Sequence, residues 1–288
     1  MTADSETLVV AAYVFAKELP SLRRWGRPPR IEDEELIALA VAQAASGICS
    51  DRQFLGIVGR LLPGWFPRLP DQTQYNRRLR SLAPRLVWVQ QRLAAQLASG
   101  KLRVADGTLI GVANYAGCGS RSEFAGSAAY GYCAAKSRYY WGMRLVLLTD
   151  RRGLPVGYTL VPANEREYEP VRALALGDGC RMLLADKGLW GAEYAETLRL
   201  EGIALRTPDR RRTAANRERE RRLASLRLVI ESTIANLKCQ MRLEEHLAKT
   251  LAGLVARIAA RLLALTLGMY LNAELGRPLR SLVTYDGR

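Results

Sequence analysis

The sequence predicts an α/β protein, in which a mixed β-sheet is flanked by helices and is preceded by an all-helical region. In the first hundred residues, apolar side chains recur at helical spacing between capping and turn signals. After Lys101 the pattern changes to short apolar runs separated by turns that contain glycine, which is typical of strands. The run 182–185 is continuously apolar, as expected of a strand covered on both faces. Strands and helices then alternate, and this order predicts a sheet with helices on both sides.

Capping residues divide the helical region into separate helices. Each expected start has side chains that favour a helix N-terminus: the acidic residues 32–35, then Ser50 or Asp51, then Asp71 with Gln74 at capping-box spacing, and finally Pro84. The last of these helices is expected to run to Leu97, and Ser99-Gly100 ends the region. We therefore expect a separate helical domain over residues 1–99.

The helix opened by Asp71 carries the basic residues Arg77, Arg78 and Arg80. Two short helices followed by an Arg-rich one are similar to a helix-turn-helix DNA reader, whose arginines contact phosphates or base edges. A plain helical bundle with one basic helix fits equally well, because the turn chemistry of that motif is missing. The three arginines are candidate DNA contacts, and residues 1–99 are a candidate DNA-binding domain.

The sheet is expected within residues 100–246. Two predicted strands end in aspartates, 102–106 at Asp106 and 181–186 at Asp186. The remaining elements follow the same periodicities: a hairpin of 140–149 with 154–161 around an Asp-Arg-Arg-Gly turn, helices over 167–176 and 194–201, and a short strand over 203–207. Asp150 and Asp178 lie beside glycines and are expected to form turns.

An apolar helix is expected in the C-terminal segment, residues 247–288. Aliphatic residues recur at helical spacing from Leu247 to Leu265. Arg257 and Arg261 interrupt this tract, and the uncharged piece after them is too short to span a bilayer. We expect this helix to pack on the sheet domain or against a second copy of the chain, with no membrane element. No targeting segment is expected at the N-terminus either.

The charge balance favours a polyanionic partner. The chain has 43 Lys+Arg against 28 Asp+Glu, a net charge of +15, and a pI near 10.0. Nucleic acid is the first candidate, and an anionic membrane is the second. The five cysteines are scattered and form no Cys-x-x-Cys pair, which argues against a disulfide framework or a zinc site and fits a reducing cytosol.

Three acidic residues combine into a candidate metal site. Asp106 and Asp186 each end a predicted strand, and chemistry in α/β sheets collects beyond such carboxyl ends. Neighbouring strands lie about 4.8 Å apart, so the two carboxylates can share a divalent ion if their strands are neighbours. Glu231, on a predicted helix, can supply a third ligand. Carboxylates with Mg²⁺ suit phosphoryl transfer, and with His246 as the single histidine the chain offers little other general-base chemistry.

Basic residues surround Glu231 in sequence. If 227–238 is helical, Arg227, Glu231 and Lys238 lie within roughly 40° of one another. On spacing alone, these three charged side chains are expected to form solvated salt bridges on the helix surface. Asp106 and Asp186, however, favour a functional site. The tract 206–242 has eleven Lys+Arg against four Asp+Glu, which favours phosphate contacts. The candidates are Arg210, Arg211, Arg212, Arg217, Arg219, Arg221 and Arg222, while Lys187 either contacts DNA or neutralises the site.

Five motifs together resemble one known family. They are Leu-Leu-Ala-Asp186-Lys-Gly, the segment Gly142 to Gly153, Pro162-Ala163-Asn164, Leu205-Arg-Thr-Pro208, and Arg227-x3-Glu231-x6-Lys238. In this order they are similar to bacterial insertion-sequence DDE transposases, over about residues 102–271. The basic helices before them match the N-terminal DNA-binding region that is usual in that family.

The resemblance implies a ribonuclease-H-like fold and a metal-binding triad of Asp106, Asp186 and Glu231. It assigns Arg227 and Lys238 to DNA contacts near the cleaved phosphate. The implied cofactor is Mg²⁺, for which Mn²⁺ can substitute. The implied partners are double-stranded DNA, as terminal inverted repeats and as target, and a second copy of the chain in a dimer or higher oligomer. The implied location is the bacterial cytoplasm, on nucleoid DNA.

The chain departs from the family pattern at several positions. Gly107 stands where Ser or Thr commonly follows the first aspartate, Leu189 replaces a tyrosine, Ala224 replaces an aromatic residue, and Val146 replaces a histidine. These changes fit a distant subgroup or a decayed copy. Two alternatives to an active transposase remain open. One is a catalytically inactive DNA-binding remnant, and the other is a nuclease of the same fold that cleaves without joining.

Overall fold

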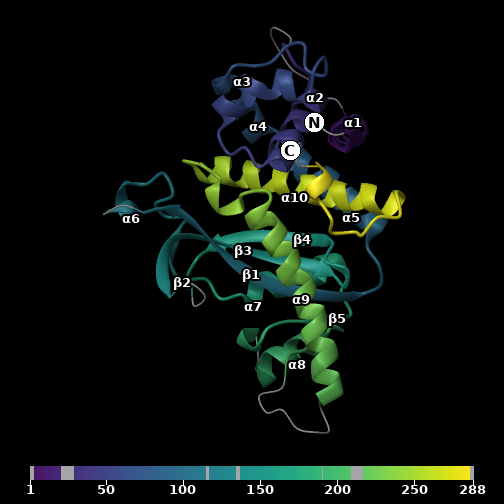
Figure 1. The fold of residues 1–288 in the computed structure, drawn as a ribbon. Coiled ribbons are helices and arrows are strands. Elements are labelled where there is room, and N and C mark those ends of the chain that lie inside the picture. Colours follow the sequence, from purple (N-terminus) through teal and green to yellow (C-terminus); the bar gives the residue numbers. More distant parts are fainter. Residues whose placement is uncertain are drawn as a thin grey trace. The chain divides into compact units, whose positions relative to one another are not determined.

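The computed structural model describes residues 3–20, 29–114, 117–133, 137–189, 191–208 and 217–285. The chain forms two compact units, one of residues 94–235 and one of residues 1–93 with 236–288 (Figure 1). The C-terminal segment that begins at the predicted boundary of residue 247 thus belongs to the same unit as the N-terminal helices.

The helical unit is built around two strongly buried helices. These are α2 (Asp33–Ser46) and α10 (Leu251–Glu274), with most of their residues buried. The surrounding helices are α1 (Ala3–Lys17), α3 (Asp51–Leu61), α4 (Gln72–Ser81) and α5 (Ala83–Leu97). The 3₁₀ turns Leu243–Glu245 and Val283–Tyr285 flank α10 in the chain.

The helix starts confirm the predicted capping residues. Glu32 and Glu35 form a capping box at α2, in which the backbone N–H of Glu32 donates to Glu35 Oε2 at 2.7 Å. Ser50 Oγ accepts from the N–H of Gln53 at 3.3 Å. Asp71 Oδ1 accepts from the N–H of Gln74 at 2.9 Å and opens α4.

The connections between helices do not match the predicted motif before α4. Residues 47–50, with Gly47 in the left-handed conformation, join α2 to α3, whereas residues 62–71 join α3 to α4. A helix-turn-helix has a turn of three or four residues, often with glycine. The Arg-rich helix α4 is therefore not the second helix of a short-turn motif.

The apolar helix α10 is long and apolar enough to cross a membrane by length and composition, and it is the one such helix among the described residues. However, 78% of its most apolar window is buried within the protein. Its charges are satisfied internally, because Arg257 forms an ion pair with Asp51 and Arg261 donates to the carbonyl of Met241 at 2.8 Å. These contacts are those of a core helix of the helical unit, whereas the sequence analysis expected packing on the sheet domain or against a second copy.

The sheet unit has a six-stranded mixed sheet. Its strands are β1 (Leu102–Ala113), β2 (Ala129–Cys133), β3 (Arg138–Asp150), β4 (Pro155–Pro162), β5 (Met182–Leu184) and β6 (Ala204–Arg206). The order is β2-β3-β1-β5-β6, and β4 also pairs with β3. Strands β1 to β4 pair antiparallel, whereas β5 and β6 run parallel to β1.

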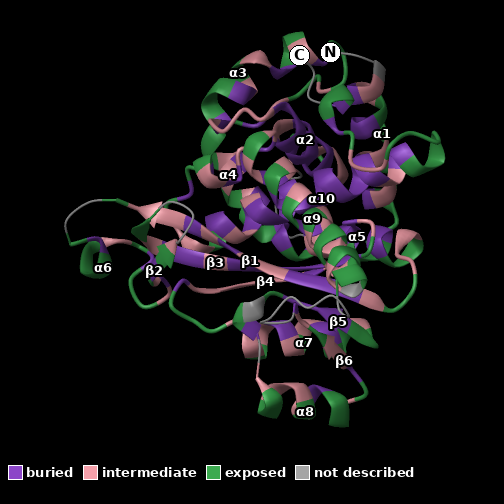
Figure 2. Cartoon of the chain, turned by 60° about the horizontal axis from the view of Figure 1, so that its bottom comes forward, coloured by how far each residue is buried: buried purple, intermediate pink, exposed green. Residues whose placement is uncertain are grey.

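Helices cover both sides of this sheet, as predicted (Figure 2). Helices α7 (Tyr168–Asp178) and α8 (Ala192–Leu200) lie on one side, and α9 (Arg217–Cys239) lies on the other. Two short helices, α6 (Cys118–Arg121) and the 3₁₀ turn Lys187–Leu189, complete the unit. Thr233 Oγ1 of α9 donates to the carbonyl of Gly153 at 2.9 Å and ties this helix to the β3–β4 turn.

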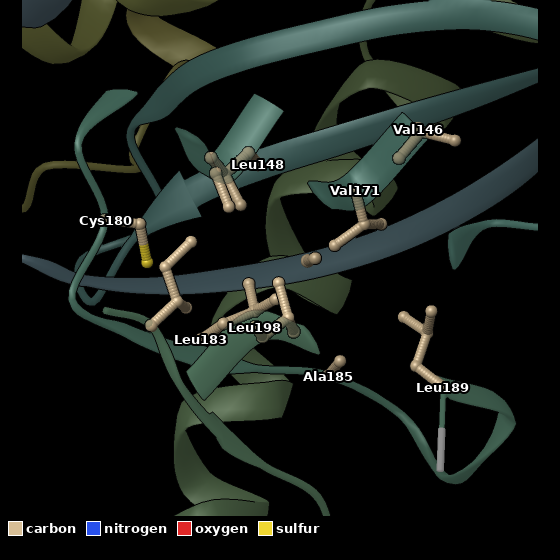
Figure 3. Packing of buried hydrophobic residues seen from close by; sticks show 11 residues of the cluster. Val146, Leu148, Val171, Cys180, Leu183, Ala185, Leu189 and Leu198 are labelled. Carbon is tan, nitrogen blue, oxygen red and sulfur yellow. The ribbon is translucent and has the colours of Figure 1, made fainter. Parts of the chain in front are cut away.

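An apolar cluster fills the space between the sheet and α7 with α8 (Figure 3). Val146 and Leu148 of β3 pack in this cluster with Val171 of α7, Leu183 of β5 and Leu198 of α8. Val146, one of the departures from the family pattern, is completely buried here. The periodicity of the sequence therefore identified this layer correctly.

Two expectations about the strands are wrong. Asp106 does not end its strand, because β1 continues to Ala113 along β3 and the two strands pair from Arg103 to Ala113. Strand β2, which pairs with the first half of β3, was not expected at all. Both additions depend on β3, whose hydrogen bonds stabilise segments that have weak strand periodicity of their own.

Candidate active site

Asp106 and Asp186 lie side by side where the parallel strands separate. The last paired residues of β1 and β5 are Val104 and Leu184, and each aspartate follows two residues later in its chain. Strand β5 ends there while β1 continues, so Asp106 still lies at the carboxyl end of the parallel pair. The strands are therefore neighbours, as the shared metal site requires.

Glu231 reaches the same region from α9. Arg227, one turn earlier on that helix, places its Nη1 at 3.1 Å from Asp186 Oδ1 and its Nη2 at 3.8 Å from Glu231 Oε1. Asp186 and Glu231 are both half exposed. One guanidinium thus links two of the three predicted ligands, and its charge also acts on the third, Asp106.

The carboxyl group of Asp106 is the most desolvated of the three. Its pKa is raised from 3.8 to about 6, mainly by burial and to a smaller extent by the negative charges of Glu167 and Asp186. The N–H of Gly107, which donates to Asp106 Oδ1 at 2.8 Å, and the charge of Arg227 both lower this pKa. A buried carboxylate that lacks full compensation favours binding of a cation.

A second charged group lies behind Asp106, where Glu167 pairs with Arg144 next to Gly107. The sequence did not predict this association. Glu167 precedes α7 and forms an ion pair with Arg144 of β3, whose Nη2 also donates to the carbonyl of Ala163 at 3.1 Å. A Cβ at Gly107 would lie 2.5 Å from Glu167 Oε1. A side chain at this position would have to displace the carboxylate of Glu167, which lies over the strand.

The donor atoms of the triad fit a divalent cation. All three ligands are carboxylates, the hard oxygen donors that Mg²⁺ and Mn²⁺ take. In the described conformation no group of three His, Cys, Asp or Glu side chains among the described residues encloses an ion site. Arg227 lies between Asp186 and Glu231 instead, so a cation at this site has to displace its guanidinium.

We expect Asp106→Asn to raise the free energy of unfolding of the metal-free protein at pH 8 by about 1–3 kcal/mol. The folded-state pKa of about 6 is above the ordinary 3.8, so Asp106 makes its most favourable contribution to stability below pH 4. That contribution is lost as the pH rises through 6. Urea unfolding in EDTA at pH 4 and pH 8 measures the difference.

A suitable control for this prediction is Glu193→Gln, at an exposed position in the first turn of α8. This variant makes the same change of charge and should show no comparable gain at pH 8. A gain for Asp106→Asn that is equal at both pH values would contradict the desolvation of its carboxylate.

The predicted DNA contacts have different environments. Arg77, Arg80 and Arg217 are exposed, whereas the guanidinium of Arg78 pairs with Asp33 at 2.9 Å and donates to the carbonyl of Ile31. Arg78 is therefore a structural residue and not a phosphate contact. Lys238, later on α9, pairs with Glu244 at 3.0 Å. Arg210, Arg211 and Arg212, and the side chains of Lys187 and Arg219, lie outside the described residues.

A comparison with protein families gives the family of this chain. The family model described as "Transposase DDE domain" matches residues 98–267, which include all three carboxylates. No curated protein sequence matches the chain.

Solved structures with detectable similarity are complexes of the Mos1 transposase. They include the paired-end complex with left transposon end (13% identity, 77% of this chain and 82% of that chain, TM-score 0.24). The others are the mariner paired-end complex with Mn (13%, 86% and 99%, 0.23) and a pre-cleavage transpososome (16%, 93% and 82%, 0.23). TM-scores this low carry no argument about this chain. The family model, however, covers more than half of the 288 residues, and the protein therefore belongs to the DDE transposase family.

Proposed function

We propose that this transposase acts on the terminal inverted repeats of a bacterial insertion sequence and uses Mg²⁺ for strand cleavage and strand transfer. The observation that carries the proposal is the approach of three carboxylates, from β1, from the end of β5 and from α9, around one arginine. The family uses divalent metal, and the donor set of Asp106, Asp186 and Glu231 suits a small hard cation.

The three carboxylates differ in their surroundings, and Arg227 links two of them. Asp106 is held from within the sheet by the N–H of Gly107, while the half-exposed Asp186 and Glu231 face the solvent from which DNA approaches. Bound by these groups, Mg²⁺ supplies activation of the attacking oxygen and stabilisation of the leaving oxygen. Arg227 keeps the two exposed carboxylates paired beforehand, and its charge is available to a phosphate group once a cation takes its place.

Both chemical steps are in-line displacements at phosphorus. Water attacks the phosphodiester at the end of the element and frees a 3′-hydroxyl group. That hydroxyl then attacks a phosphodiester of the target and displaces a target 3′-oxygen, so one bond forms for each bond broken. No covalent intermediate with the protein is needed. The reaction takes place on two DNA ends, which suits a dimer or higher oligomer on nucleoid DNA in the bacterial cytoplasm.

The departures from the family pattern favour an active enzyme over a decayed copy. Gly107 leaves the space that the carboxylate of Glu167 occupies, and Leu189 is buried in the core beside α7 and α8. These two changes are therefore matched by the surrounding structure. Ala224 is exposed, and nothing in the structure explains it.

A joining assay tests the proposal. The purified chain is given pre-cut DNA ends from the element and a supercoiled target, with Mg²⁺ or with EDTA. We expect joined products only with Mg²⁺ and only with the ends of the element, while DNA ends of scrambled sequence serve as the control. Hydrolysis without joined products would identify a nuclease, and DNA binding without cleavage would identify an inactive remnant.

A further inference from the structure

The hairpin formed by β2 and β3 carries a row of aromatic side chains, which we call the aromatic ladder: Tyr130, Tyr132, Tyr139 and Trp141. Tyr132 faces Tyr139 across the two strands, with ring centroids 5.1 Å apart, and Tyr130 faces Trp141 at 5.0 Å. The three tyrosines are exposed by 56%, 53% and 70% for positions 130, 132 and 139. Cross-strand pairs of this kind stabilise a hairpin, but they do not require rings this exposed.

The register places the aromatic ladder on the same face of the sheet as the side chain of Asp106. Asp106 is directly opposite Leu147 of β3, and alternate residues of β3 back to Trp141 and Tyr139 share that face. Strand β3 has no inserted residue in this stretch, because the irregularity near Gly111 lies in β1. Six residues of strand separate Leu147 from Trp141, which corresponds to about 20 Å.

The charges around the aromatic ladder suit a polyanion. From Gly107 to Thr149 the sequence has one acidic residue, Glu123, against Arg121, Lys136, Arg138 and Arg144. Arg138 stacks its guanidinium on the ring of Tyr140 at 4.5 Å, but these two residues alternate with Tyr139 and Trp141 and lie on the opposite face of β3. Among the described residues, the cation on the side of the ladder is the exposed Arg121, which belongs to α6, the helix that contacts Tyr130 and Trp141. Exposed aromatic rings beside arginines are the side chains on which unpaired bases stack.

The two pairs of the ladder differ in how far they are covered. A Cβ at Gly119 of α6 would lie 3.6 Å from Cη2 of Trp141, and the hydroxyl of Tyr130 is 3.5 Å from Sγ of Cys118. Helix α6 therefore supports the inner pair. Tyr132 and Tyr139 form the outer pair, in which Tyr139 is exposed by 70%, whereas Trp141 of the inner pair is only partly exposed.

We infer that the aromatic ladder binds unpaired bases of the DNA strand whose phosphate lies at the three carboxylates. This inference rests on the proposed function, because it places DNA on the face of Asp106. Tyr139 of the outer pair lies eight residues from Leu147 along β3, about 26 Å, which at roughly 3.4 Å per nucleotide corresponds to about eight nucleotides from the cut. Stacking on Tyr132 and Tyr139 holds a frayed or single-stranded end and leaves its phosphates to the exposed Arg121 of α6.

The test compares two double variants on two DNA ends. Tyr132→Ala/Tyr139→Ala removes the outer rings, and Tyr132→Phe/Tyr139→Phe is the matched control that keeps them. One DNA end is blunt, and the other has a single-stranded overhang of about eight nucleotides with 2-aminopurine as a fluorescent base. We expect the Ala variant to bind the overhang about five- to 150-fold more weakly, with unchanged affinity for the blunt end and no quenching of 2-aminopurine. The Phe variant should behave like the wild type.

Each other result has a definite meaning. If the wild type binds neither DNA, the proposed function fails together with this inference. If the wild type binds both and the Ala variant binds equally well, only the aromatic ladder inference fails. An equal loss on both ends would assign the ladder to duplex contacts, and a change of sedimentation without a change of affinity would assign it to a second copy of the chain. Both of these outcomes would overturn the stacking of bases.

Discussion

Asp186→Asn is expected to lower Mg²⁺-dependent strand cleavage by at least about 1,000-fold, which corresponds to about 4 kcal/mol of transition-state stabilisation. Asp186 is half exposed just beyond β5, so the amide removes a negative ligand without leaving a cavity in the core. Its ion pair with Arg227 is exposed to solvent and contributes little to stability. Cleavage of labelled element ends measures the effect, and thermal unfolding should change little.

The affinity for DNA should survive this substitution. The variant loses one negative charge, which weakens no phosphate contact and reduces repulsion from the DNA backbone. Glu231→Gln is expected to give the same separation, because its carboxylate approaches Arg227 from the other side. Cleavage that persists in both variants would show that the chemistry takes place elsewhere.

A matched control for Glu231→Gln lies on the same helix. Glu218 of α9 pairs with Arg222 one turn later and is largely exposed, so Glu218→Gln makes the same chemical change outside the site. Such i,i+4 pairs are worth about 0.3–0.5 kcal/mol, and cleavage should be nearly unchanged. Loss of activity in this control as well would indicate that α9 is unstable, and the result for Glu231 could not be assigned to metal binding.

The elements that the sequence predicted are those with local signals. The hairpin of β3 and β4 has a turn built around Asp150, which accepts from the N–H groups of Arg152 at 2.8 Å and Leu154 at 3.0 Å. A continuous apolar run predicted β5, and apolar residues at helical spacing predicted α9. The apolar runs also predicted the cluster that packs against the sheet. These signals also placed Asp186 just beyond its strand and Glu231 within its helix.

The features that the sequence did not predict depend on contacts between residues that are far apart in the chain. The second half of β1 contains Gly107 and Gly111, and it is a strand because β3 supplies its hydrogen bonds. Asp178, expected as a turn former, ends α7 and pairs with the buried Arg103 at 2.6 Å. Arg78 was predicted to contact DNA, but in the structure its guanidinium pairs with Asp33, which is distant in sequence.

One signal for the group behind Asp106 was present in the sequence. A glycine inside a strand marks a place where another part of the chain approaches closely, and Gly107 is such a residue. The sequence could not identify Glu167 as that neighbour, because the contact depends on where α7 begins and on the position of Arg144 in β3. The departure at Gly107 thus reflects packing and does not weaken the assignment of Asp106.

A second glycine gives the largest expected effect on stability. Gly142→Ala should lower the free energy of unfolding by about 3 kcal/mol, because the added Cβ would lie 2.0 Å from the carbonyl oxygen of Ile110. That atom belongs to the backbone of β1, so no side chain can rotate away and the strands themselves have to move. Urea unfolding of the purified variant measures the loss.

The consequence of this substitution reaches the active site through the register. Gly142 pairs with Gly111 of β1 and with Ala129 of β2, and the same β1–β3 ladder holds Asp106 opposite Leu147. Separation of the strands at Gly142 should therefore lower cleavage as well as stability. Gly177→Ala in α7 is the control: no heavy atom lies within 4 Å of the added Cβ, and alanine should stabilise the helix by about 0.5–1 kcal/mol. If Gly142→Ala were as stable as this control, the close pairing of β1 with β3 that positions Asp106 would be wrong.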